Sequence, residues 1–413
     1  MHSELIYGCI GEHLPHSFSR EIHGEIGSYA YELKELTPEE LPGFMTSRGF
    51  MGINVTIPYK QAVIPFLDEI DETARAIGAV NTVVSRNGKL TGYNTDLYGL
   101  TRLIRRIGLD LSGKKVLVLG TGGTSRTASY AAQQLGAREV FRVSRTAREG
   151  SLSYEEVLLR HTDAEIILNT TPCGMFPCPA EQPLPLEPFT CLEGVADAIY
   201  NPLRSRLVLD ALSRGIPAEG GLYMLVAQAV RASELFLDKA YPENLTDRIY
   251  DRILHRKENL VLIGMPGSGK SAVGSVLTRI AGKPVADTDQ LIVEKAGKSI
   301  PDIFREDGES AFRDLETEII RELSLQGGQI ISTGGGAVLR PENVTLLRQN
   351  GRLFWLDRDP DSLVPTDDRP LADTAVKMKQ LYQERKPIYR ASADVIIPVF
   401  GTPEDTASLI LQQ

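Results

Sequence analysis

Residues 259–271 read Asn-Leu-Val-Leu-Ile-Gly-Met-Pro-Gly-Ser-Gly-Lys-Ser and join a short apolar run to a glycine-rich turn. An apolar run of this length, bounded by a turn, is typical of a buried strand in a parallel sheet. The turn fits the pattern G-x-x-x-x-G-K-[ST], in which backbone N–H groups surround phosphate oxygens. Lys270 adds positive charge at the β- and γ-phosphates, and the Ser271 hydroxyl is a ligand for Mg²⁺. The pattern predicts a nucleotide site that also includes Gly264, Gly267, Ser268 and Gly269.

A second run of the same kind lies earlier in the chain, at residues 115–125. It carries Gly120, Gly122 and Gly123, and Ser125 stands where the third glycine of a dinucleotide-binding fingerprint would be. Taken alone, this pattern is compatible with dinucleotide binding and with a simple glycine-rich turn. The two runs are far enough apart to lie in different domains, so we expect two α/β units.

The end of the next predicted strand, residues 139–144, favours one dinucleotide over the other. An NAD enzyme would place Asp or Glu there to bind the ribose 2′-hydroxyl. This chain instead has cations and hydroxyls, which suit the 2′-phosphate of NADP, although a solvated turn is the alternative interpretation. The residues concerned are Ser144, Arg145, Thr146 and Arg148.

Composition and charge exclude several classes of protein. Of the 413 residues, 42% are hydrophobic and 24% are charged, which is ordinary for globular proteins and unlike collagenous or disordered chains. With 45 Lys and Arg against 54 Asp and Glu, the net charge is −9, so we expect no nucleic-acid or membrane partner. The four cysteines have neither disulfide-scaffold nor metal-site spacing. No signal-peptide pattern precedes the first apolar run, so we expect a soluble, cytoplasmic protein.

Several motifs follow the nucleotide turn in the second half of the chain. Two carboxylates, Asp287 and Asp289, stand two positions apart after a predicted strand, and three glycines follow the strand at residues 329–332. With Phe312-Arg313, Asp368-Arg369 and Arg385-Lys-Pro-Ile-Tyr389, these motifs make the chain from residue 259 to about 407 similar to shikimate kinase.

This resemblance implies a role for each motif. Asp287 would serve Mg²⁺, and Asp289 would bind the hydroxyls of shikimate and take the proton as the 3-hydroxyl attacks ATP. Arg313 and Arg385 would clamp the shikimate carboxylate, and Arg369 would lie on a lid that closes over ATP. Close approach of the backbone to the shikimate ring is implied for Gly334, Gly335 and Gly336.

The first half carries a different set of motifs. Residues 52–60 end in a proline-containing turn that presents Lys60, and the motif at residues 92–96 ends in Asp96. Together with the motifs at residues 17–19, 78–82, 169–175, 200–202 and 221–228, they make residues 4 to about 254 similar to shikimate dehydrogenase.

The resemblance implies that Lys60 and Asp96 form the catalytic pair, and it leaves open which of them is the formal proton donor. A carbonyl that accepts hydride gathers negative charge on its oxygen, so an acid must lie nearby. The residues implied to hold the substrate are Ser17, Ser19, Thr56, Asn81, Tyr200 and Gln228. Those implied to bind the cofactor are Gly120, Gly122, Gly123, Thr124, Ser144, Arg145, Thr146, Arg148 and Gly221.

Together these resemblances imply a bifunctional enzyme of the shikimate pathway. It would reduce 3-dehydroshikimate to shikimate with NADPH and then phosphorylate shikimate with MgATP. Two alternatives stay open: a quinate dehydrogenase that uses NAD, joined to a kinase-like domain, and a non-catalytic sensor of pathway metabolites. The implied fold is an α/β substrate domain and a Rossmann NADP-binding domain, fused to a P-loop kinase domain. The implied boundaries are 1–102 with about 224–255, then 103–223, and 257–413.

Overall fold

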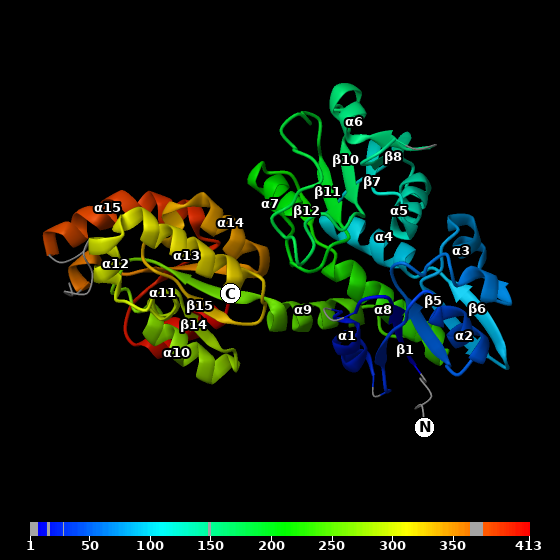
Figure 1. The fold of residues 1–413 in the computed structure, drawn as a ribbon, viewed down its shortest axis with the longest axis horizontal. Helices are drawn as coiled ribbons and strands as arrows, with labels where there is room; N and C mark the ends of the chain where they lie inside the picture. The colour runs from blue at the N-terminus through cyan, green and yellow to red at the C-terminus, as the bar shows by residue number, and fades with distance from the viewer. Residues whose placement is uncertain (1–6, 15–16, 28, 148–149, 364–374) are drawn as a thin grey trace. The chain divides into compact units, whose positions relative to one another are not determined.

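The computed structural model describes residues 7–14, 17–27, 29–147, 150–363 and 375–413. Contacts within the chain divide it into two compact units, Met1–Leu254 and His255–Gln413. Both units are built from helices packed on largely parallel β-sheets, which places the chain in the α/β class (Figure 1). Among the described residues, no helix is long and apolar enough to cross a membrane.

The first unit begins with a six-stranded sheet whose strand order is β2-β1-β3-β5-β6-β4. Strand β5 runs antiparallel to both β3 and β6, whereas β1, β2 and β3 run parallel. Its strands are β1 (Tyr7–Gly11), β2 (Glu32–Glu35), β3 (Gly52–Val55), β4 (Glu69–Ile70), β5 (Thr82–Arg86) and β6 (Lys89–Tyr93). Its helices are α1 (Ser19–Ile26), α2 (Glu40–Ser47), the 3₁₀ helix η1 (Ile64–Phe66) and α3 (Glu72–Ile77). Ile10, Ile53, Val83 and Leu90 pack with Met45 of α2 in one core.

The second sheet of this unit is wholly parallel, in the order β12-β11-β10-β7-β8-β9. Its strands are β7 (Lys115–Leu119), β8 (Glu139–Ser144), β9 (Leu152–Ser153), β10 (Ile166–Asn169), β11 (Gly194–Asp197) and β12 (Ala218–Glu219). The helices are α4 (Asp96–Ile107), α5 (Gly123–Gln134), α6 (Tyr154–Arg160), α7 (Arg206–Ser213), α8 (Leu222–Leu237) and α9 (Leu245–Lys257).

Helices cover both faces of this sheet. Val116 and Val118 of β7 pack in a core with α4, α5 and α8, while Leu117 and Leu119 pack in another with α6 and α7. Successive side chains of a strand point to opposite faces, so a strand covered on both sides must be apolar at every position. This burial explains why the strand reads as a continuous apolar run.

Helix α8 packs against α4 and also reaches the first sheet. The two helices approach so closely that a Cβ at Gly99 would lie 2.5 Å from the Met224 carbonyl oxygen. In β3, a Cβ at Gly52 would lie 2.3 Å from the ring of Phe236, near the end of α8. Helix α8 therefore contacts elements of both sheets within the first unit.

The second unit has a five-stranded parallel sheet in the order β14-β15-β13-β16-β17. Its strands are β13 (Asn259–Ile263), β14 (Val285–Asp287), β15 (Ile330–Ser332), β16 (Gly351–Asp357) and β17 (Val395–Pro398). The α-helices are α10 (Lys270–Ala281), α11 (Thr288–Ala296), α12 (Ile300–Glu306), α13 (Gly308–Ser324), α14 (Pro341–Asn350), α15 (Ala375–Ser392) and α16 (Pro403–Leu411). Short 3₁₀ helices are η2 (Ala337–Leu339) and η3 (Pro360–Ser362). In the central strand, Val261 and Ile263 pack on the α14 and α15 side, and Leu260 and Leu262 on the α10 and α16 side.

The junction between the units is helical. Helix α9 ends at Lys257 and β13 begins at Asn259, without an intervening loop. The Nζ of Lys283 donates hydrogen bonds to the carbonyl oxygens of His255 and Glu258, at 2.6 and 2.5 Å. A cation at the carboxyl end of a helix opposes the negative end of the helix dipole. Burial lowers the pKa of Lys283 from its ordinary value.

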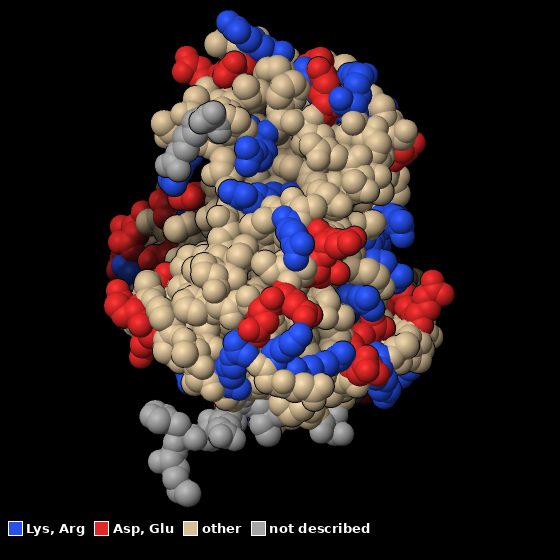
Figure 2. All heavy atoms as spheres, turned by 90° about the vertical axis from the view of Figure 1, so that its right-hand side faces the viewer, with Lys and Arg blue, Asp and Glu red and all other residues tan. Residues whose placement is uncertain are grey.

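Charged side chains of both signs share the surface. On the face drawn in Figure 2, Lys and Arg side chains are interspersed with Asp and Glu side chains. Charges of neither sign cover the described part of that face. A mixed surface of this kind creates no strong field of one sign over the face.

One buried histidine gives the first unit a predicted dependence of stability on pH. His23 in α1 is fully buried, its ring stacks on Tyr31 at 3.7 Å, and its Nδ1 lies 2.5 Å from the Tyr29 hydroxyl. Burial lowers the pKa of His23 from 6.5 to about 3, against the opposing effect of a hydrogen bond to Asn54. The folded state therefore keeps this ring neutral, whereas the unfolded chain takes up a proton below about pH 6.5. His23 therefore does not reduce the free energy of unfolding above that pH. Below it, the free energy of unfolding decreases as the pH drops toward 3.

We expect His23 to cost the first unit about 2 kcal/mol of unfolding free energy between pH 7 and pH 5. His23→Gln, which cannot take up this proton, should lose that part of the pH dependence. Urea unfolding followed by far-UV circular dichroism measures it. The chain's one tryptophan, Trp355, lies in the second unit, so its fluorescence follows that unit separately. Equal pH dependence in the native chain and the variant would contradict the assignment.

Candidate active sites

A lysine and an aspartate form a nearly buried ion pair in the first unit. Lys60 lies in the turn that follows β3, and its Nζ is 2.6 Å from Oδ2 of Asp96. The side chains are only 12% and 8% exposed, so water screens the pair weakly. Asp96 is the first residue of α4, where the partial positive charge of the helix amino end favours a carboxylate. The structure therefore brings the two predicted catalytic residues together.

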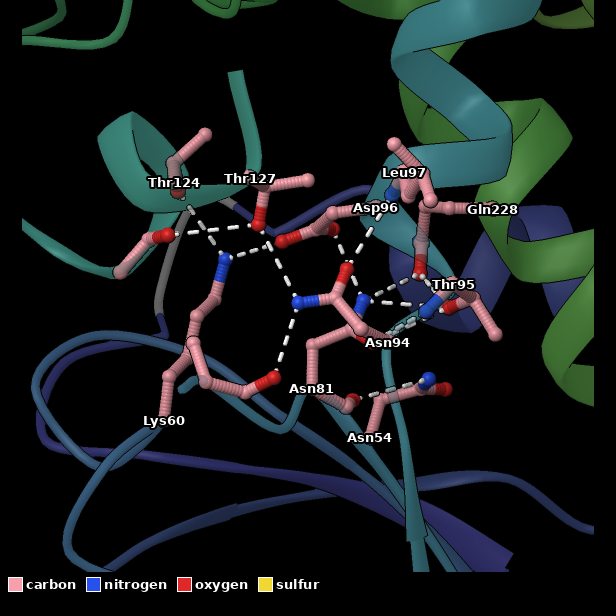
Figure 3. A network of polar contacts seen from close by, with 12 residues as sticks. Asn54, Lys60, Asn81, Asn94, Thr95, Asp96, Leu97, Thr124, Thr127 and Gln228 are labelled. Atoms are coloured by element: carbon pink, nitrogen blue, oxygen red, sulfur yellow. Dashed lines mark hydrogen bonds and ion pairs between the residues drawn. The ribbon is translucent and has the colours of Figure 1, made fainter. Parts of the chain in front are cut away.

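Asn81 holds the other oxygen of this carboxylate. Its Nδ2 donates to Oδ1 of Asp96 at 2.8 Å and lies 3.4 Å from Oε1 of Gln228, on α8 (Figure 3). The same amide group lies 3.1 Å from Oγ1 of Thr95, whose backbone N–H in turn donates to Asn81 Oδ1 at 2.7 Å. Two predicted substrate residues, Asn81 and Gln228, thus share a network with the ion pair, although 147 positions separate them in the sequence.

Four polar residues that support this network were not predicted as site residues. The buried Asn54 accepts a hydrogen bond from the Tyr31 hydroxyl at 2.7 Å. Asn94 caps α4 by accepting from the backbone N–H of Leu97. The signal available in the sequence was the placement of these residues in or near the predicted motifs at 52–60, 92–96 and 115–125. The four are Asn54, Asn94, Thr95 and Thr127.

A second group of predicted substrate residues lies around the start of α1. Ser17 Oγ is 3.1 Å from Ser19 Oγ, and the phenol of Tyr200 interacts with Ser17. Burial raises the pKa of Tyr200 to about 12, so its hydroxyl keeps its proton at neutral pH and can donate a hydrogen bond. Thr56 directly follows β3, in the turn that leads to Lys60. These side chains offer hydroxyl groups, which suit a polyhydroxylated carboxylic acid.

The glycine-rich turn after β7 leaves backbone N–H groups open at the start of α5. Gly120 has φ of +111°, and a Cβ there would lie 2.8 Å from Thr170 Oγ1. Nothing lies within 4 Å of a Cβ built on Gly122. Ser125 takes the place of the third glycine of the fingerprint. Its Oγ donates to the Gly120 carbonyl at 2.6 Å and so stabilises the turn. The open amino end of a helix after such a turn is suited to a pyrophosphate.

The end of β8 presents the residues predicted to select the dinucleotide. Ser144 Oγ donates to the Thr146 carbonyl at 2.5 Å, and Arg145 between them is exposed. Arg148 lies outside the described residues. Gly221, the residue before α8, packs so closely on Ala198 that a Cβ would lie 2.2 Å from its carbonyl oxygen. An open helix end, together with an exposed guanidinium directly after the neighbouring strand, fits a dinucleotide that carries a 2′-phosphate.

In the second unit, the turn between β13 and α10 forms a phosphate cradle. Gly264, Gly267 and Gly269 have φ of +144°, +79° and +98°, conformations that side chains disfavour. Lys270 Nζ donates to the carbonyls of Gly264 and Met265, at 2.9 and 3.0 Å. The buried Ser268 hydroxyl has no hydrogen-bond partner among the described atoms. The geometry of this turn fits the phosphates of a bound nucleoside triphosphate.

Two oxygen groups of the kind that magnesium prefers lie next to this cradle. Ser271 Oγ donates to Oδ2 of Asp287 at 2.8 Å, and Oδ1 of Asp287 accepts from the Asp289 backbone N–H at 3.0 Å. Mg²⁺ prefers oxygen ligands and usually takes few from the protein, with phosphate and water completing its shell. In the described residues, no group of three or more His, Cys, Asp or Glu could hold a metal. One hydroxyl and one carboxylate therefore fit a magnesium ion that the nucleotide shares.

The three glycines after β15 lie among the predicted acceptor-site residues. A Cβ at Gly334 would lie 2.6 Å from Oδ1 of Asp289, and a Cβ at Gly336 would lie 2.3 Å from Nη2 of Arg313. Arg385, on α15, donates to the Gly335 carbonyl at 3.0 Å. The structure thus brings together Asp289, Arg313, Gly334, Gly335, Gly336 and Arg385. Arg369, the predicted lid residue, lies outside the described residues.

A buried glutamate completes this group and was not predicted. Glu316, one helical turn after Arg313 on α13, accepts from its Nη1 at 2.8 Å and is fully buried. Burial raises the pKa of Glu316, and the Arg313 guanidinium acts against that rise. Its other carboxylate oxygen, Oε1, would lie 2.7 Å from a Cβ at Gly334. The i, i+3 spacing from Arg313 was the available sequence signal.

Two family models match the chain. The shikimate dehydrogenase substrate binding domain matches residues 9–83, and shikimate kinase matches residues 266–413. A shikimate dehydrogenase (NADP(+)) from Geobacillus kaustophilus is 39% identical over 253 residues, which are 56% of this chain and 92% of the relative.

Solved structures resemble the same part of the chain. Shikimate 5-dehydrogenase from Thermus thermophilus, solved with NADP(H) and shikimate, is 30% identical with a TM-score of 0.55, covering 60% of this chain and 99% of its own. A chorismate mutase/shikimate 5-dehydrogenase fusion protein from Clostridium acetobutylicum is 33% identical with a TM-score of 0.57, covering 61% and 97%. The fusion protein is a relative in which a dehydrogenase of this type is joined to another enzyme.

Proposed function

Because the chain belongs to the shikimate dehydrogenase family and also carries a shikimate kinase domain, we propose that it catalyses two successive reactions on one substrate. The first unit reduces 3-dehydroshikimate to shikimate with NADPH, and the second phosphorylates the 3-hydroxyl of shikimate with MgATP. The hydroxyl that the first reaction creates is the one that attacks in the second. Both activities belong to the shikimate pathway.

The observation that carries the first reaction is the nearly buried pair of Lys60 and Asp96, 2.6 Å apart. Bound NADPH supplies the hydride. Lys60 donates a proton or a hydrogen bond to the substrate oxygen as negative charge grows there, and its low exposure strengthens that interaction. Asp96 orients the ammonium, and Asn81 in turn orients Asp96. The hydroxyls of Ser17, Ser19, Thr56 and Tyr200 and the amide of Gln228 bind the carboxylate and hydroxyls of the substrate.

In the second reaction, Asp289 binds the 3-hydroxyl and takes its proton. Arg313 and Arg385 hold the shikimate carboxylate, a geometry that the planar fork of a guanidinium suits. The glycines at 334–336 let the substrate ring approach, because a side chain at Gly334 or Gly336 would meet Asp289 or Arg313. Lys270 and the backbone of residues 264–269 hold the phosphates, while Ser271 and Asp287 hold Mg²⁺. The resemblance to shikimate kinase assigns Arg369 to the support of the transferred phosphoryl group.

One assay with 3-dehydroshikimate, NADPH, ATP and Mg²⁺ tests both halves. We expect NADPH oxidation and then shikimate 3-phosphate, detected by mass spectrometry. Lys270→Met should stop the sequence at shikimate. Reduction without any phosphorylated product would reject the kinase proposal, and absence of reduction with added shikimate still phosphorylated would reject the dehydrogenase proposal.

The substitution Arg145→Ala tests the proposed preference for NADP over NAD. Loss of a charge-assisted contact to the 2′-phosphate should raise the KM for NADPH by about 10- to 100-fold. The KM for NADH should change little, because NADH has no 2′-phosphate. Arg138→Ala removes a cation at the other end of β8 and is the matched control, with both KM values unchanged. Equal losses with both cofactors in Arg145→Ala would show that Arg145 does not contact the 2′-phosphate.

A further inference from the structure

Thr124, in the first turn of α5, directs its side chain toward Lys60. Its Oγ1 lies 3.1 Å from Lys60 Nζ and accepts a hydrogen bond from it (Figure 3). The adjacent Gly123 lies against the stem of the same lysine, since a Cβ there would be 3.2 Å from Lys60 Cβ. The first turn of the helix predicted to bind the cofactor thus contacts both the stem and the ammonium of Lys60.

This contact leaves one direction free on the ammonium. A lysine ammonium has three N–H donors. One is directed to Asp96 Oδ2 at 2.6 Å and another to Thr124 Oγ1 at 3.1 Å. Because these acceptors come from different helices, they fix the rotation of the ammonium, and the third N–H must point away from both.

The hydroxyl also supplies an acceptor where the helix backbone has none. The first turn of a helix carries free N–H groups and partial positive charge, which repel an ammonium. Thr124 Oγ1 places a partial negative charge between the start of α5 and Lys60. One turn later, Thr127 Oγ1 receives a hydrogen bond from Asn94 Nδ2 at 3.1 Å, so α5 makes two such contacts with residues that follow strands of the first sheet (Figure 3).

We propose that Thr124 is a positioning residue of the dehydrogenase, whose hydroxyl orients the Lys60 ammonium so that its third N–H faces the reacting carbonyl. The inference rests on the proposed function of Lys60. It assigns the Thr124 side chain to the acid of the reaction, while the backbone of the same turn remains available to the cofactor. The residue acts through Lys60 and donates nothing to the substrate itself.

The test compares Thr124→Val, which keeps the shape and removes the hydroxyl, with Thr124→Ser, which restores it. We expect Thr124→Val to lower kcat for 3-dehydroshikimate reduction by about 10- to 100-fold, the effect of losing one hydrogen bond to a charged group. The KM for NADPH should stay within about twofold, and Thr124→Ser should recover most of kcat. Ser129→Ala removes a hydroxyl without a hydrogen-bond partner among the described atoms from the same helix and should leave kcat unchanged.

A double-variant cycle separates positioning from a general structural role. In a Lys60→Ala background, Thr124→Val should change the residual rate by less than about twofold, because the group it orients is gone. A full additional loss in that background would overturn the proposal, as would a normal kcat in Thr124→Val or no recovery in Thr124→Ser. A rise confined to the KM for NADPH would assign the hydroxyl to the cofactor instead. Near-normal reduction by Lys60→Ala alone would reject the proposed function, a result separate from all of these.

Discussion

Lys60→Ala is expected to lower the turnover of 3-dehydroshikimate reduction by about two to four orders of magnitude, the usual contribution of a positioned acid. The side chain is the only described cation that the structure pairs with Asp96, at 2.6 Å. Alanine removes the N–H that would meet the growing charge on the substrate oxygen, and it leaves the Asp96 carboxylate nearly buried without its counter-ion. Shikimate phosphorylation should keep its native rate, because no residue of the second unit is changed. Stopped assays of the two reactions on one protein sample measure both effects.

Lys89→Ala is the matched control for this substitution. It removes a lysine of β6, in the sheet whose strand β3 precedes Lys60. Its partner Glu69 is 57% exposed and Lys89 itself is 67% exposed. An exposed pair of this kind contributes little to stability, so both activities should remain at the native level. A Lys60→Ala protein that still reduced 3-dehydroshikimate at a near-native rate would show that the ion pair is structural.

The parts of both sites that lie within single turns could be predicted from the sequence. The cradle around Lys270 is local, because its phosphate-facing geometry follows from glycines at positive φ between one strand and one helix. Lys60 and Asp96 could likewise be identified from the sequence, as members of the motifs at residues 52–60 and 92–96. Each strand's continuous apolar run predicted a sheet covered on both faces, which the cores on either side of β7 confirm.

The hydrogen-bond network could not be predicted, because tertiary packing brings its members together. Asn81 and Gln228 meet only because α8 packs across α4, where Gly99 lacks the Cβ that would lie 2.5 Å from the Met224 carbonyl oxygen. No local pattern encodes that approach. Thr124 shows the same limit, since its place in the glycine-rich turn indicated the cofactor and its side chain meets Lys60.

The second unit shows the same division between local and distant signals. Arg313 was identified as a motif residue, and Glu316 lies one turn away on the same helix. A glutamate at this spacing is usually an exposed partner in a surface ion pair. Here the carboxylate is buried, because the glycines after β15 bring the backbone against α13. Its burial, and so its perturbed pKa, depends on a segment that follows it in the sequence.

Asp289→Asn is expected to lower the rate of shikimate phosphorylation by about two to four orders of magnitude. The amide has the shape of the carboxylate but cannot take the proton of the attacking hydroxyl. In the structure, Oδ1 of Asp289 borders the glycines at 334–336, while the Asp289 backbone N–H is bound by Asp287. The substitution therefore changes the acceptor side and leaves the phosphate cradle intact, so ATP affinity measured by calorimetry should stay near the native value. Asp314→Asn is the matched control. Asp314 lies on α13, is 69% exposed and pairs with Arg340, so this substitution should leave both quantities unchanged. Normal turnover in Asp289→Asn, or a loss explained wholly by weaker ATP binding, would contradict the assignment of Asp289 to the attacking hydroxyl.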